Sequence, residues 1–167
     1  MVKYYLEYLI DGKIPSDCTE FECYNKKLNK LPELPQTLKY LDCHINNLTE
    51  LPKLPHTIKY LDCGNNNLNE LPELPQTLQH LYCYSNNLSD LPELPQTLKH
   101  INCIKNKLNK LPELPQTIKY LYCSNNNIKY LSYKNCQTIK KLKYVNLLYN
   151  PFSANFTNND EFISSLE

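Results

Sequence analysis

Cysteine is the residue whose type and spacing in this chain first suggest chemistry. Six of the eight cysteines recur at intervals of 20 residues, at Cys23, Cys43, Cys63, Cys83, Cys103 and Cys123. Structural zinc sites and dithiol redox centres usually hold two of their cysteines a few residues apart, as in CxxC. The longer interval favours a role for these thiols in packing, so we predict no metal site and no redox centre.

Pairs of histidine and aspartate at the same interval are the next candidates for chemistry. His80 and His100 are 20 residues apart, as are Asp42 and Asp62, and such pairs could bind a metal or act as acid and base. No Ser-His-Asp arrangement, glycine-rich phosphate loop or HExxH motif accompanies them. We therefore predict that the protein is not an enzyme and has no cofactor and no catalytic residue.

The interval of 20 belongs to a repeat that covers most of the chain. LPELPQTLKYLDCHINNL, residues 31–48, is followed by copies that begin at residues 51, 71, 91 and 111. In each copy, apolar and polar residues alternate over the few positions that lead up to the cysteine, which indicates a short strand. A single copy buries only one face, so the copies are expected to stack around a shared core with their strands in one parallel sheet.

Three other features of the repeat have distinct expected roles. Leu38, Leu41 and their equivalents would line the core. Asn46 and its equivalents would lie in the turn after the strand, where the amide can bond to the backbone of its own and the next repeat. The L-P-x-L-P segment of residues 51–55 lacks two backbone N–H groups and disfavours helix, which predicts an extended, polyproline-like limb on the convex side.

The stacked arrangement also decides the expected state of the thiols. Cysteines on neighbouring parallel strands would lie about 4.8 Å apart and point the same way. A disulfide instead requires Cβ atoms about 3.8 Å apart on converging vectors. We therefore expect buried, reduced thiols, including those of Cys18 and Cys136, and an intracellular, reducing compartment.

The repeat resembles the short, bacterial-type leucine-rich repeat of the Yersinia and Shigella type III effectors. The resemblance rests on L-P-x-L-P and on L-x-x-L-x-C-x-x-N-x-L, and it covers residues 14 to about 152. The strand cysteine, the Asn-, Lys- and Tyr-rich filler and the near-identical copies also resemble leucine-rich-repeat proteins of giant, mimivirus-like DNA viruses. The resemblance implies an α/β-type, mostly β solenoid: a right-handed coil with a parallel concave sheet and extended convex limbs. It further implies protein binding, and a viral protein that acts in the cytoplasm of an infected host cell.

The same template extends beyond the regular copies, so the chain is expected to form one domain over residues 1–167. We place five regular repeats in residues 31–130, a degenerate first repeat in 14–30 and a longer last repeat in 131–152, which bulges on the convex side. Residues 1–13 would form an N-terminal cap, as strand-turn-strand with Asp11-Gly12 in the turn. Residues 153–167 would form a C-terminal cap with a short helix whose N-cap residue is Asn159.

The strand positions that point away from the core form the concave face, which is the candidate binding surface. These positions vary between copies whereas the core positions do not, and tyrosine supplies rigid contact area at low entropic cost. Aromatic side chains on adjacent strands also stabilise a sheet without any partner. Both a protein-binding module and a structural or regulatory repeat protein without a high-affinity partner therefore stay open. The residues predicted to bind a protein are Tyr40, Tyr60, His80, Tyr82, Tyr84, His100, Tyr120 and Tyr122.

Charge and hydropathy argue against other kinds of partner. The net charge is +1, so we expect no binding of nucleic acid, although Lys39, Lys59, Lys99 and Lys119 recur at the strand starts. Glutamates on the convex limbs balance these lysines. Neither a signal peptide nor a membrane span is expected, because no apolar run approaches about 18 residues. We expect a monomer that binds a protein partner and no membrane.

Overall fold

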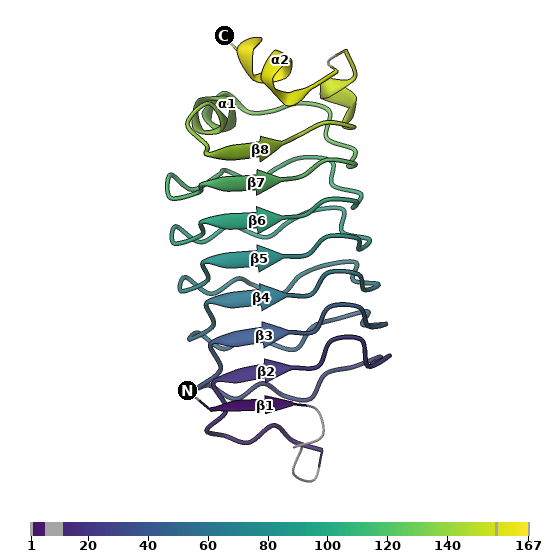
Figure 1. The fold of residues 1–167 in the computed structure, drawn as a ribbon, viewed down its shortest axis with the longest axis vertical. Helices are drawn as coiled ribbons and strands as arrows, with labels where there is room; N and C mark the ends of the chain where they lie inside the picture. The colour runs from purple at the N-terminus through teal and green to yellow at the C-terminus, as the bar shows by residue number, and fades with distance from the viewer. Residues whose placement is uncertain (1, 6–11, 156, 167) are drawn as a thin grey trace.

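The computed structural model describes residues 2–5, 12–155 and 157–166. Its strands follow the chain in order and form a single sheet in which every neighbouring pair is parallel (Figure 1). The predicted fold, a mostly β leucine-rich-repeat coil, is thereby confirmed. The strands are β1 (Lys3–Tyr5), β2 (Glu20–Glu22), β3 (Tyr40–Asp42), β4 (Tyr60–Asp62), β5 (His80–Tyr82), β6 (His100–Asn102), β7 (Tyr120–Tyr122) and β8 (Tyr144–Asn146).

The core is a continuous column of leucine and cysteine side chains behind the sheet. The middle residue of each strand from β2 onward is buried, as Leu61 and Leu81 show with no exposed surface. Leu51 and Leu54 of an L-P-x-L-P limb close the core from the opposite side, and the limb contains neither helix nor strand, as predicted. Full burial of one leucine contributes roughly 1.5–3 kcal/mol, so the repeated leucines hold the copies in register.

The repeated asparagine forms a ladder that joins each repeat to the one before it. Asn66 Nδ2 donates to the carbonyl oxygens of Cys63 and of Cys43, both at 3.1 Å. Asn66 Oδ1 accepts from the backbone N–H of Leu48 at 3.0 Å. The partner repeat is the preceding one, not the following one as we predicted. The backbone groups within reach of the Asn66 amide are those in the turn of the preceding repeat.

A second hydrogen-bonded ladder, which the sequence analysis did not identify, is made by threonine. Thr57 Oγ1 lies 2.7 Å from the carbonyl oxygen of Gln36 and 2.7 Å from that of Leu38. Its single hydroxyl proton is shared between two carbonyls of the preceding repeat. The equivalent threonines do the same: Thr37, Thr77, Thr97 and Thr117. The sequence contained a signal for this ladder, because the same threonine recurs three residues before β3, β4, β5, β6 and β7.

The N-terminal end is covered by a further parallel strand. Lys3 of β1 lies opposite Glu20 of β2, and its Nζ forms an ion pair of 2.6 Å with Glu22 Oε1 at the other end of β2. Tyr4 packs against the core from this strand. The strand-turn-strand arrangement that we predicted falls largely on residues 6–11, which lie outside the described residues. The pairing that is described is parallel, whereas a hairpin would be antiparallel.

The C-terminal end contains two helices, α1 (Tyr133–Ile139) and α2 (Asn159–Ser164), with a 3-10 turn, η2 (Pro151–Ser153), between β8 and α2. The bulge expected in the last repeat is the helix α1, which the sequence analysis did not predict. Ile139 is buried, whereas Cys136, whose thiol we expected to be buried, is only partly buried. No helix among the described residues is long and apolar enough to cross a membrane.

The helix α2 completes the last strand by a side-chain hydrogen bond. In the regular repeats the cysteine N–H donates to the next strand, as Cys43 does to the carbonyl oxygen of Asp62 at 2.8 Å. Leu147 occupies this position after β8, the last strand among the described residues, and its N–H donates to Asn159 Oδ1 at 2.9 Å. The N-cap of α2 is Asn158, one residue earlier than predicted. Its Oδ1 accepts from the backbone N–H of Glu161 at 2.8 Å.

Candidate protein-binding surface

The outward side of β2–β8, here called the sheet face, carries two columns of side chains, with a third at the strand ends. The first column is formed by the first residue of each strand, and its rings from Tyr40 to Tyr120 are stacked along the solenoid except for a tilted contact between Tyr60 and His80. Ring centroids are 4.3 Å apart for Tyr40–Tyr60, 5.9 Å for Tyr60–His80, 4.5 Å for His80–His100 and 4.3 Å for His100–Tyr120. Five of the predicted residues thus form one continuous aromatic row.

The second column, formed by the last residue of each strand, is mixed in chemistry. Tyr82 tilts toward Tyr60 with ring centroids 5.4 Å apart, and Tyr122 stacks on Tyr144 at 4.9 Å. Asn102 lies between Tyr82 and Tyr122, because β6 separates β5 from β7. The rings of Tyr82 and Tyr122 therefore contact rings of the first column and not each other. Tyr144, which was not among the predicted residues, extends the surface.

Tyr84, the remaining predicted residue, lies over the repeat before its own. A Cβ atom added to Gly64 would be 2.3 Å from the Tyr84 ring, a distance that real side chains do not reach. The glycine at this position therefore makes room for the tyrosine ring. This contact places Tyr84 beside the acidic part of the second column, where the carboxylates of Asp62 and Asp42 raise the pKa of its hydroxyl together with burial, the larger cause.

Three potential metal ligands meet at the ends of β3 and β4. One donor atom from each of Asp42, His44 and Asp62 lies within 4.8 Å of the other two. We predicted no metal. The sequence analysis paired Asp42 with Asp62, which share the second column, but it did not place His44 of the third column beside them. Within the group, His44 Nδ1 lies 2.5 Å from Asp42 Oδ1, and the His44 ring stacks on Tyr24 with centroids 5.1 Å apart. The His44 ring is therefore held by a carboxylate on one edge and a phenol on one face.

Asp42 has His44 as an ion-pair partner, whereas Asp62 forms no ion pair within 4.0 Å among the described residues. Burial raises the pKa of its carboxyl, and the neighbouring Asp42 carboxylate raises it further. Asp42 and Asp62 are directly opposite each other on β3 and β4, an arrangement in which like charges destabilise a sheet. The acidic part of the sheet face thus carries electrostatic strain at neutral pH.

Replacing Asp62 with asparagine is expected to stabilise the fold by roughly 0.2–1 kcal/mol at pH 7, the cost of a like-charge pair across strands. The backbone contact would survive, because Asp62 Oδ1 accepts from Gly64 N at 3.0 Å and Asn102 Oδ1 accepts from Ile104 N at 3.2 Å in the same way. Urea unfolding of Asp62→Asn and the wild type at several pH values would measure the difference.

The sign of the pH dependence follows from the raised pKa. A carboxyl whose pKa is higher in the folded chain is protonated in both states at low pH, so it costs nothing there. The destabilisation develops as the pH rises between the unfolded and folded pKa values and is complete above the folded one. The gain from Asp62→Asn should therefore vanish on acidification. A gain of equal size at pH 3 and pH 7 would show that charge is not its cause.

The two histidines of the first column are neutral at neutral pH. Burial is the largest cause that lowers the pKa of His80, followed by the charges of His100 and Lys99. Burial likewise lowers the pKa of His100, with Lys119 and Lys99 adding to the shift. Their stacked contact is therefore a contact between uncharged aromatic rings, like those of the tyrosines on either side.

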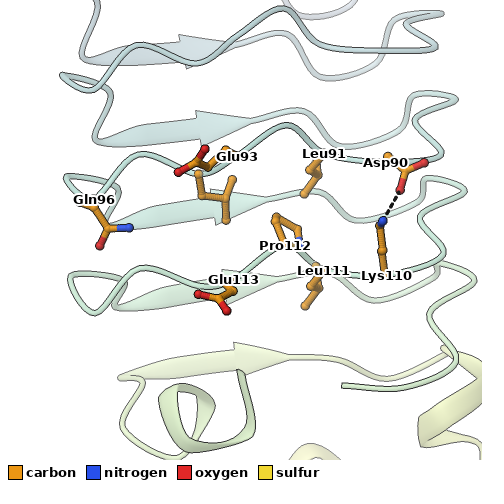
Figure 2. A pocket seen from close by; sticks show the side chains of 9 residues that line it. Asp90, Leu91, Glu93, Gln96, Lys110, Leu111, Pro112 and Glu113 are labelled. Carbon is orange, nitrogen blue, oxygen red and sulfur yellow. Dashed lines mark ion pairs between the residues drawn. The ribbon is translucent and has the colours of Figure 1, made fainter. Parts of the chain in front are cut away.

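Three grooves lie between successive convex limbs, and among the described residues that line them there is no catalytic grouping. Figure 2 shows the groove between two successive limbs, where Leu91, Leu111 and Pro112 form the floor. Lys110 Nζ lies 4.0 Å from Asp90 Oδ1 and so links the two repeats across it. Similar grooves recur between other limbs. They follow from the repeat geometry itself and do not suggest a separate ligand site.

A stack of 20-residue turns, with one parallel sheet, an asparagine ladder and proline-containing limbs, defines a leucine-rich-repeat solenoid. No protein-family model and no curated protein matches the sequence. Among solved structures, the leucine-rich-repeat domain of a Shigella effector is similar at 31% identity and a TM-score of 0.73, over 83% of this chain and 72% of that one. The chain belongs to this leucine-rich-repeat family, which confirms the resemblance to the bacterial effectors.

Two further structures support the assignment. YopM from Yersinia enterocolitica is 29% identical with a TM-score of 0.68, and the match covers 83% of this chain and 34% of that protein. YopM from Yersinia pestis, described as a leucine-rich effector protein, is 30% identical with a TM-score of 0.66 over 82% and 45%. The chain thus spans less than half of either YopM chain. The likeness to giant-virus proteins stays a prediction, since these neighbours are bacterial.

Proposed function

We propose that the protein is a non-enzymatic interaction module that binds a protein partner through the sheet face. The observation that carries the proposal is the continuous aromatic row of the first column, half-exposed on a rigid sheet. Tyrosine-rich surfaces on a rigid frame suit protein recognition, because the rings lose little entropy on binding. Membership in a family that includes bacterial leucine-rich effectors supports the same function.

The thiols of the module support a proposal for its cellular setting. All eight cysteines are free, and Cys43, Cys63, Cys83 and Cys103 are fully buried. A protein that keeps a column of reduced thiols in its core is suited to a reducing compartment. We therefore place the interaction inside a cell and, by the resemblance to effectors and to viral proteins, inside a host cell.

Removal of three sheet-face anchors tests the proposal. Tyr60→Ala, Tyr82→Ala and Tyr120→Ala, combined in one variant, are expected to lower partner capture from cell extract at least about tenfold, since a few anchors carry most of an interface's energy. Each replacement should cost only about 0.2–1 kcal/mol of stability, because it removes cross-strand contacts and leaves the core intact. Capture by immobilised protein, with circular dichroism as a check of the fold, measures both effects.

The chain offers a matched control with the same chemistry elsewhere. Tyr130, Tyr133 and Tyr149 are 66%, 74% and 75% exposed and lie outside the two strand columns. Their combined replacement by alanine removes the same number of phenols and should leave capture unchanged. Loss of capture in the control variant but not in the sheet-face variant would place the binding surface elsewhere. Equal capture by all proteins would favour a structural role for the aromatic row.

A further inference from the structure

The net charge of +1 conceals a strong charge gradient along the solenoid. Residues 94–158 contain ten lysines and one acidic residue, Glu113, whereas residues 1–93 contain thirteen acidic residues and eight lysines. Because the strands stack in chain order, this difference in sequence becomes a difference between the two ends of the sheet (Figure 1). The helix α2, which follows the last strand, carries the acidic residues Asp160 and Glu161. The basic part includes β6, β7 and β8, and the acidic part includes β2, β3 and β4.

The gradient is expressed on the sheet face itself. Lys99, Lys119 and Lys143 immediately precede β6, β7 and β8, and their backbones are joined by hydrogen bonds of 2.8 Å and 2.9 Å. These three residues are called the basic row. Neighbouring parallel strands lie about 4.8 Å apart, so the row spans about 10 Å. No strand residue of β6, β7 or β8 is acidic.

The charge of the basic row is not neutralised within the described part of the chain. The ion pairs at this end join Lys110 to Asp90 and Lys134 to Glu113, and neither involves the row. Lys99 Nζ donates to the neutral amide of Gln79 at 2.9 Å. Asp160 of α2 lines a shallow pocket with Lys143 but forms no ion pair with it within 4.0 Å.

The equivalent positions at the other end have the opposite surroundings. Lys39 and Lys59 precede β3 and β4 and are exposed, as Lys119 and Lys143 are. Their strands, however, end in Asp42 and Asp62, and β2 begins and ends in glutamate. Lysines of the same type and at the same repeat position therefore lie in an acidic field at one end and an uncompensated basic field at the other.

We propose that the basic row and the tyrosines beside it form a binding site for an acidic segment of a protein partner. The proposal rests on the proposed function and narrows it to one end of the sheet face and one partner chemistry. The lysine ammonium groups would bind carboxylates, and the hydroxyls of Tyr120 and Tyr144 are further donors to them. An extended peptide advances about 3.4 Å per residue, so the row fits about three residues.

The ring geometry favours a protein over a single-stranded nucleic acid. Binding of bases requires aromatic faces on which they can stack. The rings of His100 and Tyr120 are stacked with centroids 4.3 Å apart, and those of Tyr122 and Tyr144 at 4.9 Å. Since the stacking runs from strand to strand, a ligand that approaches the sheet face meets ring edges and hydroxyls. Carboxylates can use these groups, whereas bases would find few free faces.

A matched pair of charge-reversal variants tests the site. Fluorescein-labelled hexaglutamate is titrated with wild-type protein at low ionic strength, where screening is weak, and binding is followed by anisotropy. Lys119→Glu with Lys143→Glu should weaken binding at least about tenfold, because attraction becomes repulsion at the site. Lys39→Glu with Lys59→Glu makes the same change in net charge and should keep the affinity within about twofold. Lys119→Gln with Lys143→Gln should give an intermediate loss, and circular dichroism checks each fold.

The other possible results of this titration would count against the proposed site. Equal weakening by both charge reversals, or no binding of hexaglutamate to the wild type, would overturn the proposal. Tighter binding of a hexathymidylate of similar charge than of hexaglutamate would overturn it in favour of a nucleic acid. The proposed function fails separately, in the capture experiment with the tyrosine variants. Intact hexaglutamate binding by the Lys119 and Lys143 variant, with capture still lost on removal of Tyr60, Tyr82 and Tyr120, would overturn only the present inference.

Discussion

Replacing Asn86 with alanine is expected to lower the free energy of unfolding by roughly 2–4 kcal/mol. The side chain is 8% exposed, and its Oδ1 accepts from Leu68 N at 2.9 Å. Its Nδ2 donates to the carbonyl oxygens of Cys63 at 3.0 Å and Cys83 at 3.2 Å. Each lost hydrogen bond contributes about 1 kcal/mol, and a buried group left without a partner costs about 1–3 kcal/mol.

The ladder identifies which group would be left without a partner. The Cys63 carbonyl also accepts from Asn66, and the Cys83 carbonyl also accepts from Asn106. Both carbonyls would therefore keep one bond after the replacement of Asn86. Leu68 N has no second acceptor among the described residues, so its buried N–H is the group that loses its only bond. The expected cost comes mainly from this one donor.

The neighbouring asparagine is the natural control for this experiment. Asn87 is partly exposed, and its backbone N–H, which alanine retains, is the group that donates to Leu68 O at 2.8 Å. Asn87→Ala should therefore change stability by less than about 0.5 kcal/mol, as surface replacements usually do. Urea unfolding followed by circular dichroism measures both variants. Equal midpoints for Asn86→Ala and Asn87→Ala would contradict the ladder.

The native protein is expected to react with a thiol reagent at one fast site and to protect the other cysteines strongly. Burial raises the pKa of Cys23 to about 12 and the pKa of Cys43, Cys83 and Cys123 well above the ordinary value. The thiolate is the reactive form. A rise from about 9 to about 12 lowers the thiolate fraction at pH 8 roughly a thousandfold, and burial lowers access further.

Cys136 is the exception, because it is only partly buried at the end of the stack. Titration with Ellman's reagent should show one fast thiol in the native protein, and Cys136→Ser should remove that phase. All eight thiols should react in denaturant without reductant. Two or more disulfides in protein taken from a reducing cytosol, or several fast native thiols, would contradict the buried column of cysteines.

The parts of the structure that could be predicted from the sequence are those that recur in every copy of the repeat. Leu41, Cys43 and Asn46 recur with the same neighbours, so one physical role accounts for all their copies. Alternation of apolar and polar residues then decides which side chains face outward, and all the predicted first-column residues lie on that side. The sequence could not show how these rings stack, because the distance between Tyr60 and His80 depends on side-chain rotamers.

The parts that sequence did not predict are those where the repeat ends or where residues of different columns meet. The helix α1 replaces the L-P-x-L-P limb only once, so no periodic signal supports it. Asn159 completes the last strand by a contact that has no counterpart elsewhere among the described residues. Asp42 and His44 meet because a turn brings the third column back toward the second. The charge gradient was visible in the sequence, but the balanced net charge concealed it.

Photocrosslinking from the sheet face is the most direct test of the claim that this face binds a protein. A photoreactive benzoyl-phenylalanine is placed at Tyr82 in one protein and at Tyr133 in another, so that both replace an aromatic residue. Irradiation in cell extract is expected to give a covalent adduct with a partner from position 82 and none from position 133, which is on α1. An adduct from position 133 alone, or from neither position, would contradict the proposal that the sheet face is the binding surface.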